Sequence, residues 1–266
     1  MELIMLGTGS AMVTSCYNIC FALGSREEFL LVDAGGGNGI LRQAQAAGLD
    51  FKHMHDFFLT HVHTDHLLGA PWVIRVVSDL MNRGEYEGDC NVWCHAECLE
   101  LLSTLCHAAF GGKQARNLDT RIRFRLLEDG TEFSAAGMAL TAFDIGSDKT
   151  RQFGFRAILP DGQILTCLGD EPCHGPGEPY VRGCDWLLTE AFCLYEDRDR
   201  FHPYEKFHST VRDAAEKAQA LGVRNLLLYH TEDQTLPTRR TRYTAEARTV
   251  FTGNVLVPED LETILL

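Results

Sequence analysis

The sequence predicts a four-layer α/β/β/α sandwich with a functional site where the ends of several strands meet. Two observations support this prediction. Each half of the 266-residue chain begins with short apolar segments of strand length and then adds segments with helical spacing, and no linker separates the halves. We therefore expect one domain over residues 1–266.

The first half begins with short apolar runs bounded by Gly, Ser or Asp. These runs predict a meander of three strands, Leu3–Leu6, Tyr17–Leu23 and Phe29–Val32. A helix over Gly39–Ala47 follows, and the buried strand Asp56–Thr60 then ends at His61. Further on, helices over Leu67–Met81 and Ala96–Phe110 flank a strand at Asn91–Cys94.

The second half restarts with strands and closes with a helix and a last strand. A hairpin turn is expected at Pro160–Gly162 and a helix over Thr210–Leu221. The final strand of this half ends at His230. The expected strands are Phe124–Leu127, Ala139–Ile145, Phe153–Leu159, Ile164–Leu168, Asp185–Leu188 and Asn225–Tyr229.

Composition and charge limit the function classes. Hydrophobic residues make up 45% of the chain and charged residues 23%, as in ordinary globular enzymes. The sequence shows no signal segment, and no apolar run approaches the roughly 18 residues that span a membrane, which predicts a cytoplasmic protein without a membrane partner. The net charge of −13 repels polyanions, so nucleic acid is not the expected substrate.

Ten cysteines are spread along the chain, and in a cytoplasmic protein they are expected to be reduced thiols. Cys90, Cys94 and Cys98, with His95 between them, form a candidate metal cluster. Their spacing differs from that of zinc ribbons, which mostly leave two residues between cysteines, and no second cysteine pair answers them. We therefore do not predict a separate metal site there.

The strongest functional signal is the segment His61-Val62-His63-Thr64-Asp65-His66. It places three imidazoles and one carboxylate directly after a strand, where a turn can fold them around a cation. Zinc and similar borderline metals prefer this nitrogen-rich set. The alternative, a polar turn whose histidines cap the next helix, does not account for this combination of residues.

This segment matches the His-x-His-x-Asp-His signature of the metallo-β-lactamase superfamily at all its positions, and the chain resembles that superfamily. The resemblance implies the metallo-β-lactamase sandwich, with His61 and His63 on one metal and Asp65 and His66 on a second. Diiron relatives usually have glutamate at the position of His63. The resemblance therefore points to hydrolysis rather than redox chemistry.

Two later strand ends resemble the remaining ligands of the superfamily. Leu168-Gly169-Asp170 closes an apolar strand with a carboxylate, and the resemblance implies that Asp170 bridges the two metals. His230 follows another apolar strand and resembles the final histidine ligand. Each residue alone is compatible with a structural role, but their order after the first motif favours metal binding.

Within the superfamily, the chain resembles the ribonuclease Z branch in Leu6–Ala11, Leu188–Phe192 and His208–Thr210. The resemblance implies that His208 donates a proton to the leaving group and that Glu190 supports it. Each residue also has a structural alternative. His208 could simply precede a helix whose N-cap is Ser209 or Thr210, and Glu190 could be a buried carboxylate at the end of a strand.

Two aspartates complete the expected machinery. Asp65 is expected to be both a metal ligand and a catalytic residue. By the same resemblance, Asp33 orients a ligand histidine through the second ring nitrogen, as carboxylates around metal sites do. A plain turn aspartate is the alternative for Asp33.

One departure from the superfamily concerns the first metal. The family has a histidine before the segment that corresponds to Gln152–Phe155, but here the expected position falls on Gly146, and no histidine lies between His107 and His174. Water, substrate or Asp148 could complete this site, or it is weak.

The expected ligands divide accordingly into two sets. The cofactor is expected to be one or two Zn²⁺ ions, with Mn²⁺ or Fe as alternatives, because a single zinc suffices to activate water. The first set is His61, His63 and Asp170, and the second is Asp65, His66, Asp170 and His230.

A second departure is the tight hairpin between Phe155 and Asp170, where ribonuclease Z enzymes that process transfer RNA often carry a long arm. With the acidic charge, it argues against transfer RNA and for a small phosphodiester. Together with the resemblance, which implies a metal-dependent hydrolase, we expect cleavage of such a phosphodiester through a metal-bound hydroxide. The alternatives are a lactonase- or thioesterase-type ester hydrolase, and a scaffold that binds metal or a small ligand without turnover. A homodimer is left open.

Overall fold

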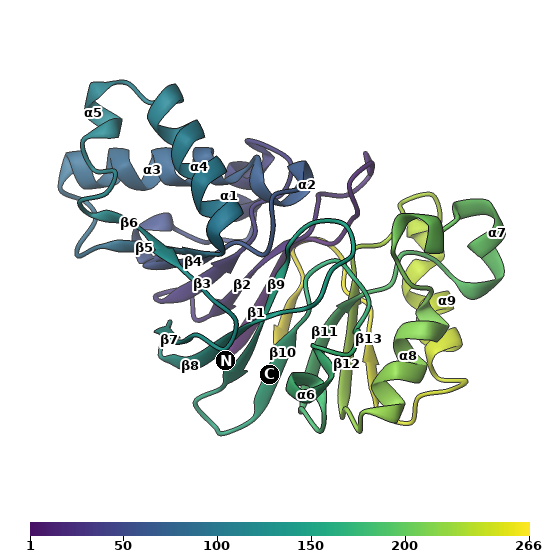
Figure 1. Ribbon diagram of the computed structural model, residues 1–266. Coiled ribbons are helices and arrows are strands. Elements are labelled where there is room, and N and C mark those ends of the chain that lie inside the picture. The colour runs from purple at the N-terminus through teal and green to yellow at the C-terminus, as the bar shows by residue number, and fades with distance from the viewer.

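Two seven-stranded mixed sheets pack face to face in the computed structural model, which describes residues 1–266 (Figure 1). The first sheet consists, in spatial order, of β14 (Thr263–Leu265), β1 (Glu2–Gly7), β2 (Cys20–Gly24), β3 (Phe29–Val32), β4 (Asp56–Phe58), β5 (Cys90–Cys94) and β6 (Ile122–Leu126). The second consists of β13 (Asn254–Leu256), β12 (Asn225–Tyr229), β11 (Trp186–Glu190), β10 (Ile164–Cys167), β9 (Phe153–Ile158), β8 (Met138–Asp144) and β7 (Glu132–Ala135).

Both sheets are antiparallel on one side and parallel on the other. In the first sheet β14, β1, β2 and β3 pair antiparallel, and β3 through β6 pair parallel. In the second sheet β7 through β10 pair antiparallel, and β10 through β13 pair parallel. Parallel neighbours have their carboxyl ends at the same edge, so each sheet offers one edge where several strand ends lie together.

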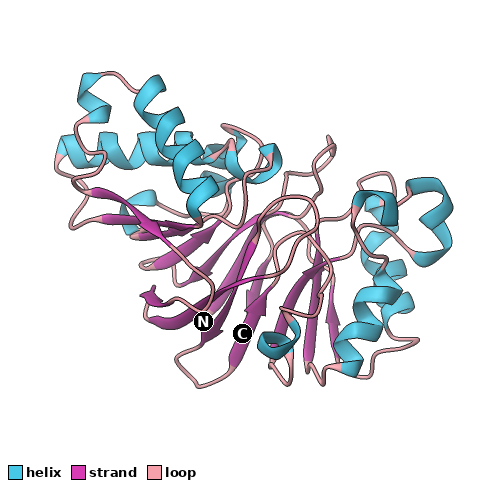
Figure 2. Cartoon of the chain, viewed as in Figure 1, coloured by secondary structure: helices cyan, strands magenta, loops and turns pink.

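Helices cover the outer face of each sheet (Figure 2). On the first sheet these include α1 (Gly39–Ala46), α3 (Ala70–Arg83), α4 (Ala96–Ala109) and α5 (Gly112–Ala115), and on the second α8 (Val211–Ala220) and α9 (Leu236–Ala247). The shorter elements are α2 (Thr64–Leu67), α6 (Glu178–Val181), α7 (Arg198–Phe201), and the 3₁₀ turns η1 (Phe51–His53), η2 (Tyr195–Asp197) and η3 (Tyr204–Lys206). None of the helices is long and apolar enough to cross a membrane.

Three hydrophobic cores lie between these layers. One fills the space between the first sheet and its helices, with Leu31 and Val73 among its members. A second lies between the two sheets and includes Phe58 and Phe155. The third lies between the second sheet and α8 and α9, with Ala215 and Tyr243. Four layers separated by three cores confirm the predicted α/β/β/α sandwich.

Most predicted elements are present with small shifts at their ends, and the main difference lies near the metal motif. The helix expected over Leu67–Met81 is divided at Gly69 into α2 and α3. A Cβ at Gly69 would lie 1.9 Å from the carbonyl oxygen of Ala34, and Gly69 N donates to Gly35 O at 2.9 Å. This close approach places the first turn after the motif against the loop that follows β3.

The helix after His208 begins where the sequence indicates. Thr210 is the N-cap of α8, because its Oγ1 accepts from Asp213 N at 3.3 Å and the Asp213 carboxylate accepts from Thr210 N at 3.0 Å. This reciprocal capping box satisfies backbone donors that a helix start otherwise leaves unpaired. Thr210, rather than Ser209, therefore ends the loop that carries His208.

Phe58 tests the packing between the two sheets. Its ring is fully buried and lies edge-on to Phe155 at 5.2 Å between centroids. We expect Phe58→Ala to lower the free energy of unfolding by about 3–5 kcal/mol, because it leaves a cavity between the sheets. Urea denaturation followed by circular dichroism measures this change. Leu126→Ala, at a side chain in β6 that is 52% exposed, serves as control, and a similar cost for both variants would contradict the packing described.

Candidate active site

The predicted ligands come from strand ends of both sheets and meet at one edge of the sandwich. His61 and His63 follow β4 in the first sheet, whereas Asp170 follows β10 and His230 follows β12 in the second. His66 lies in the short helix α2. The structure thus brings together side chains that are far apart in the sequence, because the parallel strands of each sheet end at the same edge.

The second predicted ligand set forms a compact group. Asp65 Oδ2 lies 3.4 Å from both His66 Nε2 and His230 Nε2. Asp170 Oδ2 lies 3.8 Å from His66 Nε2 and 3.6 Å from His230 Nε2. All four residues are buried.

Three of these residues fit one metal ion, because ligand atoms of Asp65, His66 and His230 lie within 4.8 Å of one another, and Asp170 approaches both histidines from another side. Ligand atoms about 2.0–2.2 Å from a zinc ion in tetrahedral geometry are separated by roughly 3.4 Å, which is the separation between Asp65 Oδ2 and each histidine. His66 Nε2 is buried and has no hydrogen-bond partner, although it points at two carboxylates. A cation among these four groups would satisfy that nitrogen and both carboxylates, so the residues fit the metal that the superfamily implies.

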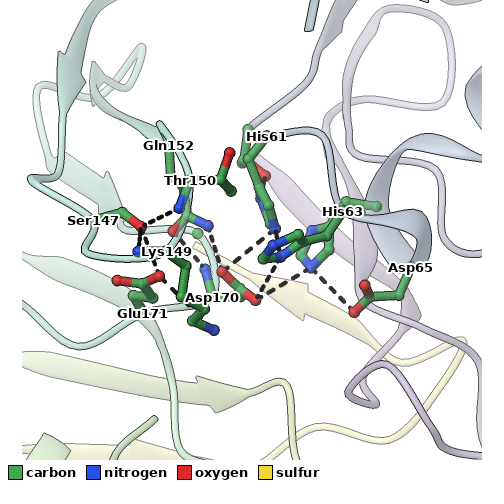
Figure 3. A network of polar contacts seen from close by, with 12 residues as sticks. His61, His63, Asp65, Ser147, Lys149, Thr150, Gln152, Asp170 and Glu171 are labelled. Atoms are coloured by element: carbon green, nitrogen blue, oxygen red, sulfur yellow. Dashed lines mark hydrogen bonds and ion pairs between the residues drawn. The ribbon is translucent and has the colours of Figure 1, made fainter. Parts of the chain in front are cut away.

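The first predicted set is less complete. His61 Nε2 lies 2.8 Å from His63 Nδ1 and 3.6 Å from Asp170 Oδ1, but His63 Nδ1 is 4.0 Å from Asp170 Oδ2 (Figure 3). Gln152 is fully buried beside them, and its amide donates to Asp170 Oδ1. Its carbonyl oxygen accepts from Asp170 N at 3.1 Å. An amide thus occupies part of the coordination capacity of Asp170 on this side.

The backbone at position 146 is unsuited to a histidine. Gly146 has φ +76°, and a Cβ there would lie 2.8 Å from Cγ of Pro176. A histidine at this position would be strained and would require Pro176 to move, so the absence of the superfamily's histidine at Gly146 is matched by the local backbone. Asp148 is exposed and is not among the residues that line the site, so the structure does not support it as a replacement ligand.

Asp33 connects the site to both neighbouring strands. Its Oδ2 lies 2.6 Å from His66 Nδ1 and accepts from Thr60 Oγ1 at 2.8 Å, while Oδ1 accepts from Thr60 N at 2.8 Å. The predicted contact between Asp33 and a ligand histidine is therefore present. It leaves Nε2 of His66 to face the metal position, as carboxylate–histidine pairs do in metal sites.

Burial and mutual charge set the ionisation of the cluster. Burial alone would raise the pKa of Asp170, but His61 and His230 hold it well below its ordinary value. Asp65 behaves in the same way beside His66, and its pKa is also held below the ordinary value. Burial lowers the pKa of His61 well below its usual range. The carboxylates are thus ionised and His61 is neutral, which are the forms that bind metal. His66 differs, because burial lowers its pKa but Asp65 and Asp33 outweigh burial and raise the pKa well above its usual value, so a bound cation would displace the proton from this ring.

His208 and Glu190 lie together at the edge of the cluster. His208 Nδ1 lies 2.9 Å from the backbone oxygen of Asp170 and 3.7 Å from Glu190 Oε2, and the ring stacks on Phe192 at 5.3 Å. Glu190 Oε1 accepts from Ser209 N at 2.7 Å. Burial lowers the pKa of His208 to about 3 and raises that of Glu190 above its ordinary value. The structure therefore brings this predicted pair together next to the ligands.

A cavity of about 600 Å³ opens over the cluster. Its lining includes the ligands His63, Asp65, Asp170 and His230, together with His208. It also includes residues to which the sequence analysis assigned no role, namely Ala11, Val62, Thr64, Lys149, Glu205, Lys206 and Phe207. Glu205, Lys206 and Phe207 precede His208 directly, so proximity to that motif was the available signal, whereas nothing in the sequence marks Lys149.

The cysteine cluster between residues 90 and 98 belongs to the hydrophobic core. Cys90, Cys94 and Cys98 are buried, and Cys98 Sγ lies 3.2 Å from His95 Nε2. Burial raises the pKa of Cys90 and of Cys94 to about 12. These thiols are core side chains held in their protonated form, and a protonated thiol is a poor metal ligand.

Comparison with known proteins agrees with this fold and site. The chain is 27% identical to a protein named ribonuclease Z from Archaeoglobus fulgidus, over 86% of this chain and 86% of that protein. Its structure is similar to the metallo-β-lactamase fold protein YhfI from Bacillus subtilis, with a TM-score of 0.78, 16% identity and coverage of 99% and 98% of the two chains. The short form of human tRNase Z has a TM-score of 0.76, 20% identity and coverage of 100% and 99%.

The fold and the converging histidines and aspartates define a metal-dependent hydrolase of the metallo-β-lactamase superfamily, in its ribonuclease Z-like branch. More narrowly, the chain belongs to the family described as anti-Pycsar protein Apyc1, whose model matches residues 1–157. That match includes the motif from His61 to His66 and ends within β9.

Asp33 provides a test of the second ligand set. We expect Asp33→Asn to weaken zinc binding about 10- to 100-fold, because an amide cannot accept from His66 and both Thr60 donors as a carboxylate does. Asparagine tolerates the positive φ of +54° at this position, so the backbone is retained. Competition with a zinc-binding dye measures the affinity. Asp148→Asn is the matched control, and equal affinities of the two variants would exclude the orienting role.

Proposed function

We propose that this protein is a phosphodiesterase that hydrolyses a small phosphodiester with the help of a bound divalent metal. The observation that carries the proposal is that one cavity is lined both by metal ligands, among them Asp65, Asp170 and His230, and by His208, which lies beside the buried Glu190. A metal-binding scaffold has no need for a proton donor beside the metal. Hydrolysis of an ester needs both charge stabilisation and protonation of the leaving oxygen.

The comparisons support a phosphodiester as the class of bond. The proteins named ribonuclease Z and tRNase Z act on RNA by their names, and the backbone of RNA is a phosphodiester. In this chain, β9 and β10 are joined by a turn over residues 159–163, so no long arm extends from this point to hold a large RNA. The net charge of −13 further disfavours a polyanion, which leaves a small phosphodiester.

The metal would be held by Asp65, His66 and His230, whose ligand atoms lie within 4.8 Å of one another, with Asp170 beside both histidines as the fourth ligand. A divalent cation bound there lowers the pKa of a coordinated water to about 7 and offsets negative charge that develops on a phosphoryl oxygen. Asp33 and Thr60 keep His66 oriented toward this position.

We also propose that residues 1–266 form a single domain, because both sheets supply ligands to this one site.

His208 would protonate the leaving oxygen. Its Nδ1 is engaged by the backbone oxygen of Asp170, so Nε2 is the atom available for proton exchange. Burial keeps the ring neutral in the free protein, since it lowers the pKa to about 3. An anionic phosphoryl group beside the ring favours its charged form and raises that pKa, so the proton is acquired in the substrate complex. Glu190 holds the loop that carries the histidine through its bond to Ser209 N.

Hydrolysis of bis(p-nitrophenyl) phosphate tests the reaction class. We expect zinc-loaded protein to release p-nitrophenol, and both a chelator and His66→Ala to abolish the release, because each removes the second ligand set or its metal. Added zinc should restore the release in the chelator-treated wild type but not in His66→Ala. Activity on lactones or thioesters without phosphodiesterase activity would replace the proposed bond class, and zinc binding without any turnover would support a scaffold. Cleavage of a precursor transfer RNA would contradict the small substrate.

Substrates with different leaving groups can show whether His208 donates a proton or only supports the structure. General acid catalysis contributes about 10²- to 10⁴-fold when the leaving group is basic. We therefore expect His208→Ala to slow hydrolysis of a phosphodiester with an alkyl leaving group by about this factor, and to affect p-nitrophenolate release much less. Initial rates with both substrates measure the ratio, and an equal loss for both would rule out proton donation.

A further inference from the structure

The loop between β8 and β9 brings a lysine to the incomplete side of the metal cluster. Lys149 lines the same cavity as His63, Asp65 and Asp170, and its side chain is only 19% exposed (Figure 3). It lies three residues before Gln152, the residue whose amide contacts Asp170. The first ligand set thus faces an ammonium group on the segment from which the superfamily supplies an imidazole.

A buried carboxylate holds this lysine in place. Lys149 Nζ lies 3.8 Å from Glu171 Oε1, which also accepts from Ser147 Oγ at 2.7 Å. Glu171 is fully buried, and its Oε2 has no partner. Ser147 Oγ in turn accepts from Lys149 N at 3.2 Å. A desolvated carboxylate attracts its counter-charge more strongly than an exposed one, so Lys149 stays at the cavity wall instead of extending into solvent.

Lys149 carries its positive charge on the wall of the cavity that His63 and Asp170 also line. The same cavity holds a second lysine, Lys206, whose Nζ donates to the backbone oxygen of Phe201 at 2.8 Å and lies over the ring of Phe192.

We propose that Lys149 supplies the positive charge that a second metal supplies elsewhere: its ammonium group keeps a divalent cation from the position between His61, His63 and Asp170, and binds a non-bridging phosphoryl oxygen of the substrate. The inference rests on the proposed function, since it assigns the substrate's phosphoryl group to this side of the cavity. The protein then holds one tightly bound metal per chain, in the second ligand set. Repulsion between a divalent cation and an ammonium group on the wall of the same cavity is the physical reason for the single ion.

Metal content tests the first half of this proposal. Wild type, Lys149→Met, Lys149→Arg and Lys206→Met are dialysed against the same free zinc concentration and measured by elemental analysis. We expect about one zinc per chain in wild type, Lys149→Arg and Lys206→Met, and a value approaching two in Lys149→Met. Thermal unfolding of each variant shows that it is folded, and the zinc content of the wild type keeps the proposal testable if the methionine variant does not fold. Two zinc ions per chain in the wild type would overturn the proposal.

Phosphate binding tests the second half. Each protein is loaded with one equivalent of zinc and titrated with inorganic phosphate in a calorimeter. We expect roughly ten- to hundredfold weaker binding in Lys149→Met, the range for loss of one charge-assisted hydrogen bond, and little change in Lys149→Arg or Lys206→Met. Equal affinity of wild type and Lys149→Met would overturn the role of Lys149. Neither measurement requires turnover, so a wild type that shows both results but cleaves no phosphodiester would refute the proposed function alone.

Discussion

The site depends on the interaction between the buried carboxylate of Asp170 and the imidazoles around it. This carboxylate is buried at the end of a strand of the second sheet, and its two oxygens lie near imidazoles from both sheets: His61 and His66 from the first, His230 from the second. Removing such a charge from water costs several kcal/mol unless nearby groups compensate. Asp170 therefore requires that both sheets end here, with their histidines turned inward and a position for a cation between them.

The strand ends and their ligands could be predicted because the signals are local. His61, His66, Asp170 and His230 each follow an apolar strand or its turn, and the alternation of strands and helices predicts the layers. Helix α9 and strand β14 were not predicted. The apolar spacing of α9 is weak, and it is held by contacts of single residues, such as the buried Arg239, which donates to Thr231 Oγ1 and Pro258 O. Contacts of this kind exist only after the chain has folded.

The loop before β9 shows why residue counting alone cannot predict which side chains reach the site. Counting residues placed the missing ligand at Gly146, but that residue adopts a positive φ and faces Pro176. Side chains three and six residues later reach the cluster instead, namely Lys149 and Gln152. Which residue of a turn faces inward depends on backbone dihedral angles that a residue count does not contain.

The pairing of β1 with β14 has a consequence for how the chain reaches its folded state. Glu2 is the partner of Leu265, so a ribosome completes the entire second sheet before the strand that borders β1 is made. Until then β1 exposes a row of unpaired amide and carbonyl groups, which can recruit strands of other chains. Sequence-distant pairings of this kind also form slowly. Nascent chains stalled before β14 should therefore be the aggregation-prone species during synthesis, and chaperone contact with the N-terminal strand would be most valuable in that interval.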